Sequence, residues 1–156
     1  MLPLPAKVLA DACAPALARW SSAREHSILK SGSRLPSSML TFATEIGIQS
    51  PATIRLEIVD QVPLPLAKRW IKLAQNIGIP LFNPSGMCLG CGISATSADP
   101  ALIRHELVHT LQFQRLGGHQ GFMWHYLFEC LRFGYAAAPL EIEARMKALS
   151  PPDRRA

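Results

Sequence analysis

The pattern of apolar and polar residues along the chain predicts a mixture of helices and strands. Apolar residues recur at helical spacing, between glycine and proline breaks, over six segments: 5–30, 37–46, 67–77, 99–116, 122–133 and 139–149. Residues 53–59 alternate apolar or β-branched side chains with charged ones, which is typical of a half-exposed strand. Residues 87–94 are rich in glycine and are expected to form an edge strand. This order of elements predicts the α+β class.

The sequence predicts the ends of one helix, 99–116, and the burial of another, 122–133. Asp99 and Pro100 form a strong helix start, because an N-cap side-chain oxygen is followed by proline at the first helical position. The pair Gly117-Gly118 predicts the end of that helix. The segment 122–133 is apolar on nearly every face, which predicts a buried helix.

Length and composition favour one globular domain. The chain has 156 residues, with 49% hydrophobic and 17% charged, which excludes a disordered chain. No internal repeat and no second domain is visible, so we expect a single domain over 1–156 whose first 50 residues form a helical region of unassigned role. No apolar stretch approaches the ~20 residues that a membrane-spanning helix needs.

Charge and cysteine content limit the kinds of partner and the cellular compartment that we expect for this protein. The chain has 16 basic and 11 acidic residues, but the basic ones are scattered, so we expect a solvated surface and no nucleic-acid partner. Four cysteines fall short of a disulfide scaffold. The N-terminus has two early prolines and no continuous apolar core, which makes a poor signal peptide. A cytoplasmic location with reduced thiols is the expectation.

The segment His105-Glu106-Leu107-Val108-His109 lies within the predicted helix 99–116. Residues four apart share one face of a helix, so both imidazoles can reach a single metal ion, and zinc takes such nitrogen ligands. Glu106 stands beside them, where it could remove a proton from a water whose pKa zinc lowers to about 7. Gln112 either prolongs this polar stripe or is simply solvated.

A catalytic zinc site needs a third protein ligand. One common variant has a histidine six residues after the second one, but that position holds Arg115, so the metzincin arrangement is excluded. Five candidates remain further along: His119, His125, Glu129, Glu141 and Glu143. Glu141 is favoured because small residues on its helix face let a neighbouring helix approach: Ala138, Ala144 and Ala148. Glu143 and Glu129 stay open.

The two later glutamates also have a purely structural interpretation. On a helix, each would form an ion pair with the basic residue four positions on, Glu141 with Arg145 and Glu143 with Lys147. Such a pair stabilises a helix by only about 0.2–0.5 kcal/mol.

These motifs resemble those of a known group of proteins. His-Glu-Leu-Val-His-Thr-Leu-Gln and the later Pro-Leu-Glu-Ile-Glu-Ala-Arg are similar to the HExxHxxQ and ExEA motifs of small bacterial zincin-like domains. These include a domain linked to extracellular contractile injection systems, and the pattern is similar to the minigluzincins. The resemblance covers 53–149 and implies a small mixed sheet with an edge strand, packed on an active-site helix and followed by C-terminal helices.

The resemblance also implies roles for individual residues. Zinc would be held by His105, His109 and Glu141, with Glu106 as general base. The edge strand would align an extended peptide through its backbone, which assigns substrate binding to Cys88, Leu89, Gly90 and Cys91. One departure is that gluzincins often have an aspartate four residues after the ligand glutamate, where this chain has Arg145.

A hydrolase must also stabilise the oxyanion of its transition state. The chain offers four possible donors: His119, His125, Tyr126 and Tyr135. We prefer Tyr135, because it lies in the loop that leads to Glu141. The hypothesis is therefore a zinc metallopeptidase that hydrolyses peptide bonds in a peptide or protein substrate.

Two other classes of function compete with the peptidase. One is an inactive zincin-like interaction module, with 122–133 as an oligomer surface. The other is a structural zinc site, because Cys88-x2-Cys91-x13-His105-x3-His109 fits the Cys2His2 spacing. Against the second, the intervening segment has one basic residue and no aromatic, and the predicted helix runs seven residues past His109.

Overall fold

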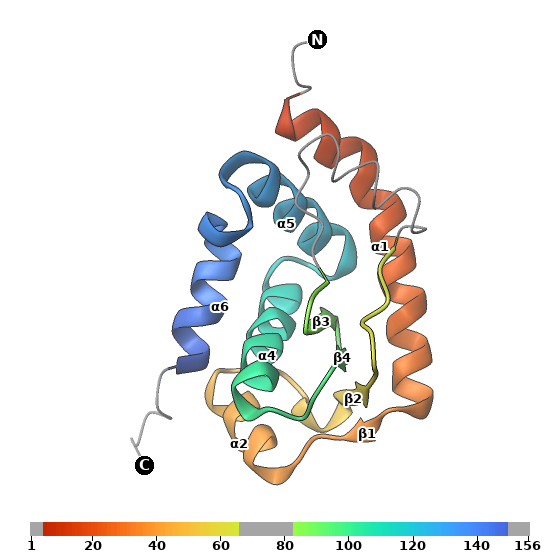
Figure 1. Cartoon of the computed structure of the whole chain (residues 1–156), viewed down its shortest axis with the longest axis vertical. Coiled ribbons are helices and arrows are strands. Elements are labelled where there is room, and N and C mark those ends of the chain that lie inside the picture. The colour runs from red at the N-terminus through yellow and green to blue at the C-terminus, as the bar shows by residue number, and fades with distance from the viewer. Residues whose placement is uncertain (1–4, 66–82, 150–156) are drawn as a thin grey trace.

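The computed structural model of the chain describes residues 5–65 and 83–149. Helices surround a small sheet (Figure 1), which confirms the α+β class. The helices are α1 (Ala6–Ser31), α2 (Ser37–Glu45), α4 (Pro100–Arg115), α5 (His119–Phe133) and α6 (Pro139–Leu149), with short 3-10 turns η1 (Pro51–Thr53) and η2 (Tyr135–Ala137). The predicted helix over 67–77 lies outside the described residues. Within the described ranges, no helix is long and apolar enough to span a membrane.

The sheet is mixed and has four short strands: β1 (Ser33–Arg34), β2 (Arg55–Ile58), β3 (Gly86–Leu89) and β4 (Gly92–Ala95). Their order is β1-β2-β4-β3, with β2 parallel to β4 and both outer pairs antiparallel. The prediction of one edge strand over 87–94 is wrong, because this segment forms a hairpin. Gly90 turns the chain with a φ of +75°, a conformation that glycine adopts without strain. Among the described strands, β1 and β3 are the two edges and β4 is internal.

The core lies between this sheet and α4. Asp99 caps α4 by accepting a hydrogen bond from the N–H of Ala101 at 3.2 Å, which confirms the predicted helix start. Leu107 and Val108 are fully buried. They directly precede His109, the second histidine of the motif. They pack with Ile93 of β4 in the main apolar cluster. The histidine-bearing helix is therefore fixed against the sheet by its own neighbours.

Helix α1 packs along α5 and also contacts the sheet (Figure 1). Four of its five buried residues are small, which lets α5 approach closely: Ala10, Ala14, Ala18 and Ser21. The fifth, Ile28, lies next to Gly92 of β4. The prediction that 122–133 is a buried helix is wrong, since Phe122 is its one buried residue. Helix α1 covers one side of α5, and the apolar side chains on the other sides stay partly exposed.

A polar network ties α1 to the hairpin and to the start of α5. One carboxylate oxygen of Glu25 accepts the N–H of Cys91 in the hairpin turn at 2.6 Å, and the other lies 2.8 Å from Nε2 of His119. Nδ1 of the same imidazole lies 2.8 Å from the hydroxyl of Ser21. Burial raises the pKa of Glu25, but the bonds from His119 and the Cys91 N–H outweigh it, so the net pKa is lowered.

We expect Glu25→Gln to lower the unfolding free energy at neutral pH by about 1 kcal/mol, the typical net value of a hydrogen bond. A carboxylate with a lowered pKa in the folded state stabilises the fold above its unfolded pKa and loses this effect as the pH falls. The difference between parent and variant should therefore shrink below the ordinary value of 4.5. Urea denaturation at neutral and acidic pH measures both differences, and equal stability at neutral pH would contradict the expectation.

Candidate metal centre

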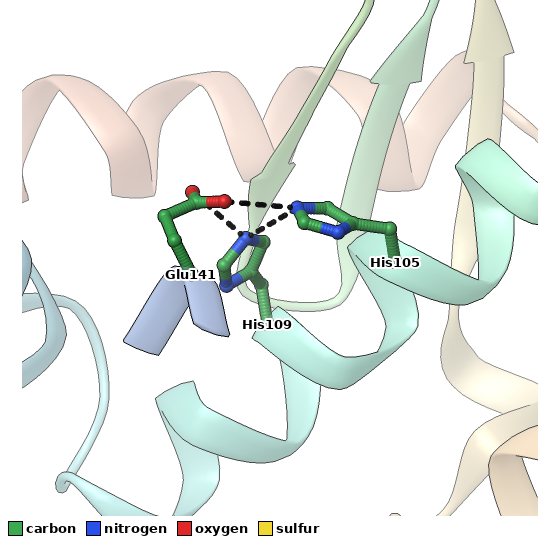
Figure 2. Close-up of side chains that lie close together, drawn as sticks. All are labelled: His105, His109 and Glu141. Atoms are coloured by element: carbon green, nitrogen blue, oxygen red, sulfur yellow. Dashed lines mark hydrogen bonds and ion pairs between the residues drawn. The ribbon is translucent and has the colours of Figure 1, made fainter. Parts of the chain in front are cut away.

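Helix α4 brings two imidazoles together, as its spacing requires. His105 and His109 are four residues apart, and their Nε2 atoms lie 3.1 Å from each other (Figure 2). Both rings point toward the carboxylate of Glu141. His109 is buried and His105 is partly exposed. One ring is therefore shielded while the other reaches solvent.

Glu141, in the first turn of α6, completes the cluster (Figure 2). Its Oε2 lies 3.3 Å from Nε2 of His105, and its Oε1 lies 3.3 Å from Nε2 of His109. Three ligands of a tetrahedral ion with bonds of about 2.0–2.1 Å would lie about 3.4 Å apart. The alanines at 138 and 144, both fully buried, let α6 come this close to α4. The cluster has the dimensions of one divalent-cation site.

The environment of Glu141 supports the presence of a cation. The residue is 1% exposed, and its Oε2 is a buried atom with no hydrogen-bond partner. Oε1 accepts the hydroxyl of Tyr126 at 2.8 Å. A buried carboxylate oxygen without a hydrogen bond costs several kcal/mol unless a metal satisfies it, and Nη1 of Arg145, at 3.7 Å, is too distant to donate one. Two neutral imidazoles and one carboxylate are a ligand set that zinc prefers when a fourth position stays open.

The other candidate ligands lie elsewhere. Glu143 forms ion pairs with Arg115 at 2.7 Å and with Lys147 at 2.9 Å. These contacts, chiefly the hydrogen bond from Arg115, lower the pKa of Glu143 to about 2. Glu129 accepts the N–H of Leu140 at the start of α6. His119 belongs to the Glu25 network, and His125 is exposed. Both predicted ion pairs on α6 form, at 2.9 Å for Glu143–Lys147 and 3.7 Å for Glu141–Arg145.

Gln112 orients one of the histidines, so the interpretation as a solvated residue is wrong. It is fully buried, and its Nε2 donates to the carbonyl of Leu140 and to Glu143, both at 2.9 Å. These two acceptors fix the amide so that Oε1 faces Nδ1 of His109 at 2.7 Å. The imidazole must then donate from Nδ1, which leaves the lone pair of Nε2 directed at Glu141 and the candidate metal position.

We expect Gln112→Leu to weaken zinc binding by about 10–100-fold, the usual effect of removing a partner that orients a histidine ligand. Leucine has a similar volume, so the fold should survive. Competition with a chelator measures the affinity. Gln114→Leu is the matched control, since Gln114 bonds to Gln49 and not to the metal centre. Equal losses in both variants would show that the effect comes from the helix and not from the histidine.

Glu106 lies beside the cluster and is almost fully buried against β3. A Cβ added to Gly86 would come within 2.6 Å of its Oε1, so this glycine makes room for the carboxylate. Burial raises the pKa of Glu106, and the two histidines and the backbone N–H of Cys88 oppose the rise without cancelling it. A carboxylate with a raised pKa suits a group that must take up a proton and give it back.

A cleft of about 600 Å³ opens over this side of the cluster. His105 and Glu106 line it from α4, the loops 83–85 and 96–99 form its walls, and Tyr135 and Arg145 border it from the C-terminal segment. Burial and the nearby Glu141 raise the pKa of Tyr135, so its hydroxyl keeps its proton. Tyr126, another possible oxyanion donor, donates to Glu141 at 2.8 Å, and a hydrogen bond to the same carboxylate contributes to the raised pKa of Tyr135.

The cysteines do not join the histidines. The thiol of Cys88 is buried 3.3 Å from the hydroxyl of Thr110, and burial raises its pKa well above the ordinary value. Cys91 lies in the hairpin turn, with the hydroxyl of Thr53 as its polar contact. Among the described residues, the group able to hold a metal consists of His105, His109 and Glu141. This geometry gives no support to the Cys2His2 alternative.

The residues assigned to substrate binding divide into two pairs. Cys88 and Leu89 belong to β3, with buried side chains and a backbone at the edge of the sheet. Gly90 and Cys91 form the turn, where the N–H of Cys91 is already bonded to Glu25. The assignment of the turn residues to an edge strand is therefore wrong.

Helix α4 supplies two imidazoles and a buried carboxylate, and α6 supplies the third candidate ligand. The cleft gives a small molecule or a peptide access to them. Comparison of the chain with known protein families, with curated proteins and with solved structures finds no match.

Proposed function

We propose that this protein is a zinc-dependent peptidase of the gluzincin type, with a zincin-like core. The observation that carries the proposal is the cluster of two imidazoles and a buried carboxylate whose second oxygen has no hydrogen-bond partner. Glu106 lies next to this cluster in the same cleft. A structural zinc site is closed by four protein ligands and requires neither a buried glutamate nor access from solvent. A hydrolytic site requires both a proton acceptor and an open coordination position.

The side chains around the cluster have separate tasks in the proposed reaction. When bound, a zinc ion supplies a Lewis acid that lowers the pKa of a water to about 7 and polarises a carbonyl. Glu106 accepts the proton of the attacking water and delivers it to the amine that leaves as the C–N bond breaks. Tyr135, with its proton retained, donates to the oxyanion from the cleft wall. Tyr126 and Gln112 hold two of the ligands in place.

The substrate would be an extended peptide lying along β3. This strand is one of the two edges of the described sheet, and an added peptide strand can pair with such an edge. Gly86, where β3 begins, also lines the cleft and contacts Glu106. A peptide aligned there would pass close to the catalytic carboxylate.

The experiment that tests the proposal combines a cleavage assay with spectroscopy. The zinc-loaded protein should cleave an unfolded protein substrate, a chelator should stop cleavage, and added zinc should restore it. X-ray absorption should show nitrogen and oxygen neighbours at about 2.0–2.2 Å and no sulfur at about 2.3 Å. Zinc binding without cleavage across a broad peptide library would favour the inactive interaction module instead.

We expect the double variant Cys88→Ser with Cys91→Ser to keep its zinc. Neither thiol belongs to the cluster, so the metal content per chain should equal that of the parent. The buried Cys88 contacts Thr110, so a modest loss of stability is compatible with this expectation. Elemental analysis of the purified variant gives the zinc content. Loss of the metal from a folded variant would support the alternative of a Cys2His2 structural zinc site.

A further inference from the structure

Arg145 borders the metal centre from the wall of the cleft. It lies on α6, one turn after Glu141, and it lines the same cleft as His105, Glu106 and Tyr135. Its Nη1 is 3.7 Å from Oε2 of Glu141, the oxygen that is itself 3.3 Å from Nε2 of His105. The side chain is 40% exposed, so a molecule entering the cleft can reach the guanidinium.

Arg145 is the one arginine or lysine among the described residues of the cleft wall. Two acidic residues line the same cleft, and both are engaged elsewhere. Asp99 caps the N-terminus of α4, and Glu106 is buried against Gly86. The carboxylate that forms an ion pair with Arg145 is that of Glu141.

A divalent cation would change the balance of charge around Arg145. The cation would take up the charge of the Glu141 carboxylate, so the ion pair with Arg145 would weaken. The guanidinium would then keep the carbonyl of Ala136, which accepts from Nη2, as its close partner. A carbonyl is neutral, so the positive charge in the cleft would be left without a matching anion.

The chemistry of the guanidinium indicates what it would bind. Its planar fork presents N–H donors in pairs that match the two oxygens of a carboxylate, and such charge-assisted bonds are about twice as strong as neutral ones. The bond to Ala136 holds the fork in the cleft wall before any ligand arrives. We propose that Arg145 binds a carboxylate of the substrate near the scissile bond.

This inference rests on the proposed peptidase function and names its substrate class. The preferred substrates are peptides with a carboxylate close to the bond that is cut. That carboxylate has two possible sources, the side chain of an internal glutamate or aspartate and the free C-terminus of the peptide. The two sources share the same chemistry at Arg145 and are separated by the experiment.

The test measures binding apart from turnover. Zinc-loaded Glu106→Gln protein is titrated calorimetrically with peptides in which each position in turn carries glutamate, glutamine or lysine. The C-terminus of each peptide is either free or amidated. We expect the best acidic peptide to bind about tenfold tighter than its amide counterpart, from one added charge-assisted pair. A preference for internal glutamate or for the free C-terminus identifies the source.

Variants at position 145 separate recognition from a structural role. In the same Glu106→Gln background, Arg145→Gln should remove the preference, Arg145→Lys should keep part of it, and Arg145→Glu should reverse it toward lysine-containing peptides. Circular dichroism and zinc content confirm that each variant is folded and loaded. A structural role alone would lower affinity for acidic and amide peptides equally.

The outcomes also separate this inference from the proposed function. Cleavage by the wild-type protein, together with equal binding of acidic and amide peptides, overturns the inference and leaves the peptidase standing. A preference that survives Arg145→Gln overturns it as well. An Arg145-dependent preference without any cleavage supports the binding site and contradicts the peptidase. Failure of every peptide to bind the loaded protein overturns the inference.

Discussion

Glu141→Gln should abolish tight zinc binding while the fold is preserved. The carboxylate supplies the one anionic ligand of the cluster, and its replacement by a neutral amide removes both charge and donor strength. Loss of a partner outside the ligand set already costs about 10–100-fold in affinity, so loss of a ligand should exceed about 100-fold. Competition with a fluorescent zinc chelator near neutral pH measures the difference.

Glu143→Gln is the matched control for this variant. It removes a carboxylate from the same helix, two residues away, whose partners are Arg115, Lys147 and Gln112. Because Gln112 also bonds to Leu140 and His109, zinc affinity in this control should fall only slightly. If Glu143→Gln loses the metal and Glu141→Gln retains it, the third ligand has been assigned to the wrong glutamate.

The parts of the site that could be predicted from the sequence depend on local geometry. His105 and His109 converge because any helix places residues four apart on one face, and Asp99-Pro100 predicts where that helix begins. The choice of Glu141 over Glu143 followed from the small residues on its face, since a metal bridge between helices needs close backbones. Its position in the structure agrees with that reasoning.

The parts that were missed depend on contacts between distant segments. Gln112 is buried because Leu140 and Glu143, 28 and 31 residues later, satisfy its amide, and no local pattern reveals this. The hairpin at Gly90 is held by Glu25 from α1, 66 residues before Cys91 in the chain. Apolar composition predicts that a helix will bury part of its surface, but the tertiary arrangement decides which side is buried. That is why α5 is far more exposed than its composition predicted.

Glu106→Gln should keep zinc and lose hydrolysis. Glutamine has nearly the shape of glutamate, so it fits the space beside Gly86 and can still accept the N–H of Cys88. It cannot accept and return a proton, and this transfer typically contributes about 10²–10⁴-fold to the rate. Steady-state cleavage of a quenched fluorescent peptide, combined with elemental analysis, measures both properties in one preparation.

Zinc content and cleavage rate must be measured together in this variant, because they report on different side chains. Zinc affinity depends on the three side chains of the cluster, whereas proton transfer depends on the carboxylate next to them, so the two should respond separately. A variant with full zinc and a rate reduced by about 10²-fold or more assigns Glu106 to the chemistry. A variant with full zinc that cleaves as fast as the parent removes Glu106 from the mechanism. A variant without zinc shows that the buried carboxylate shapes the metal centre, and the base must then be sought elsewhere along the cleft.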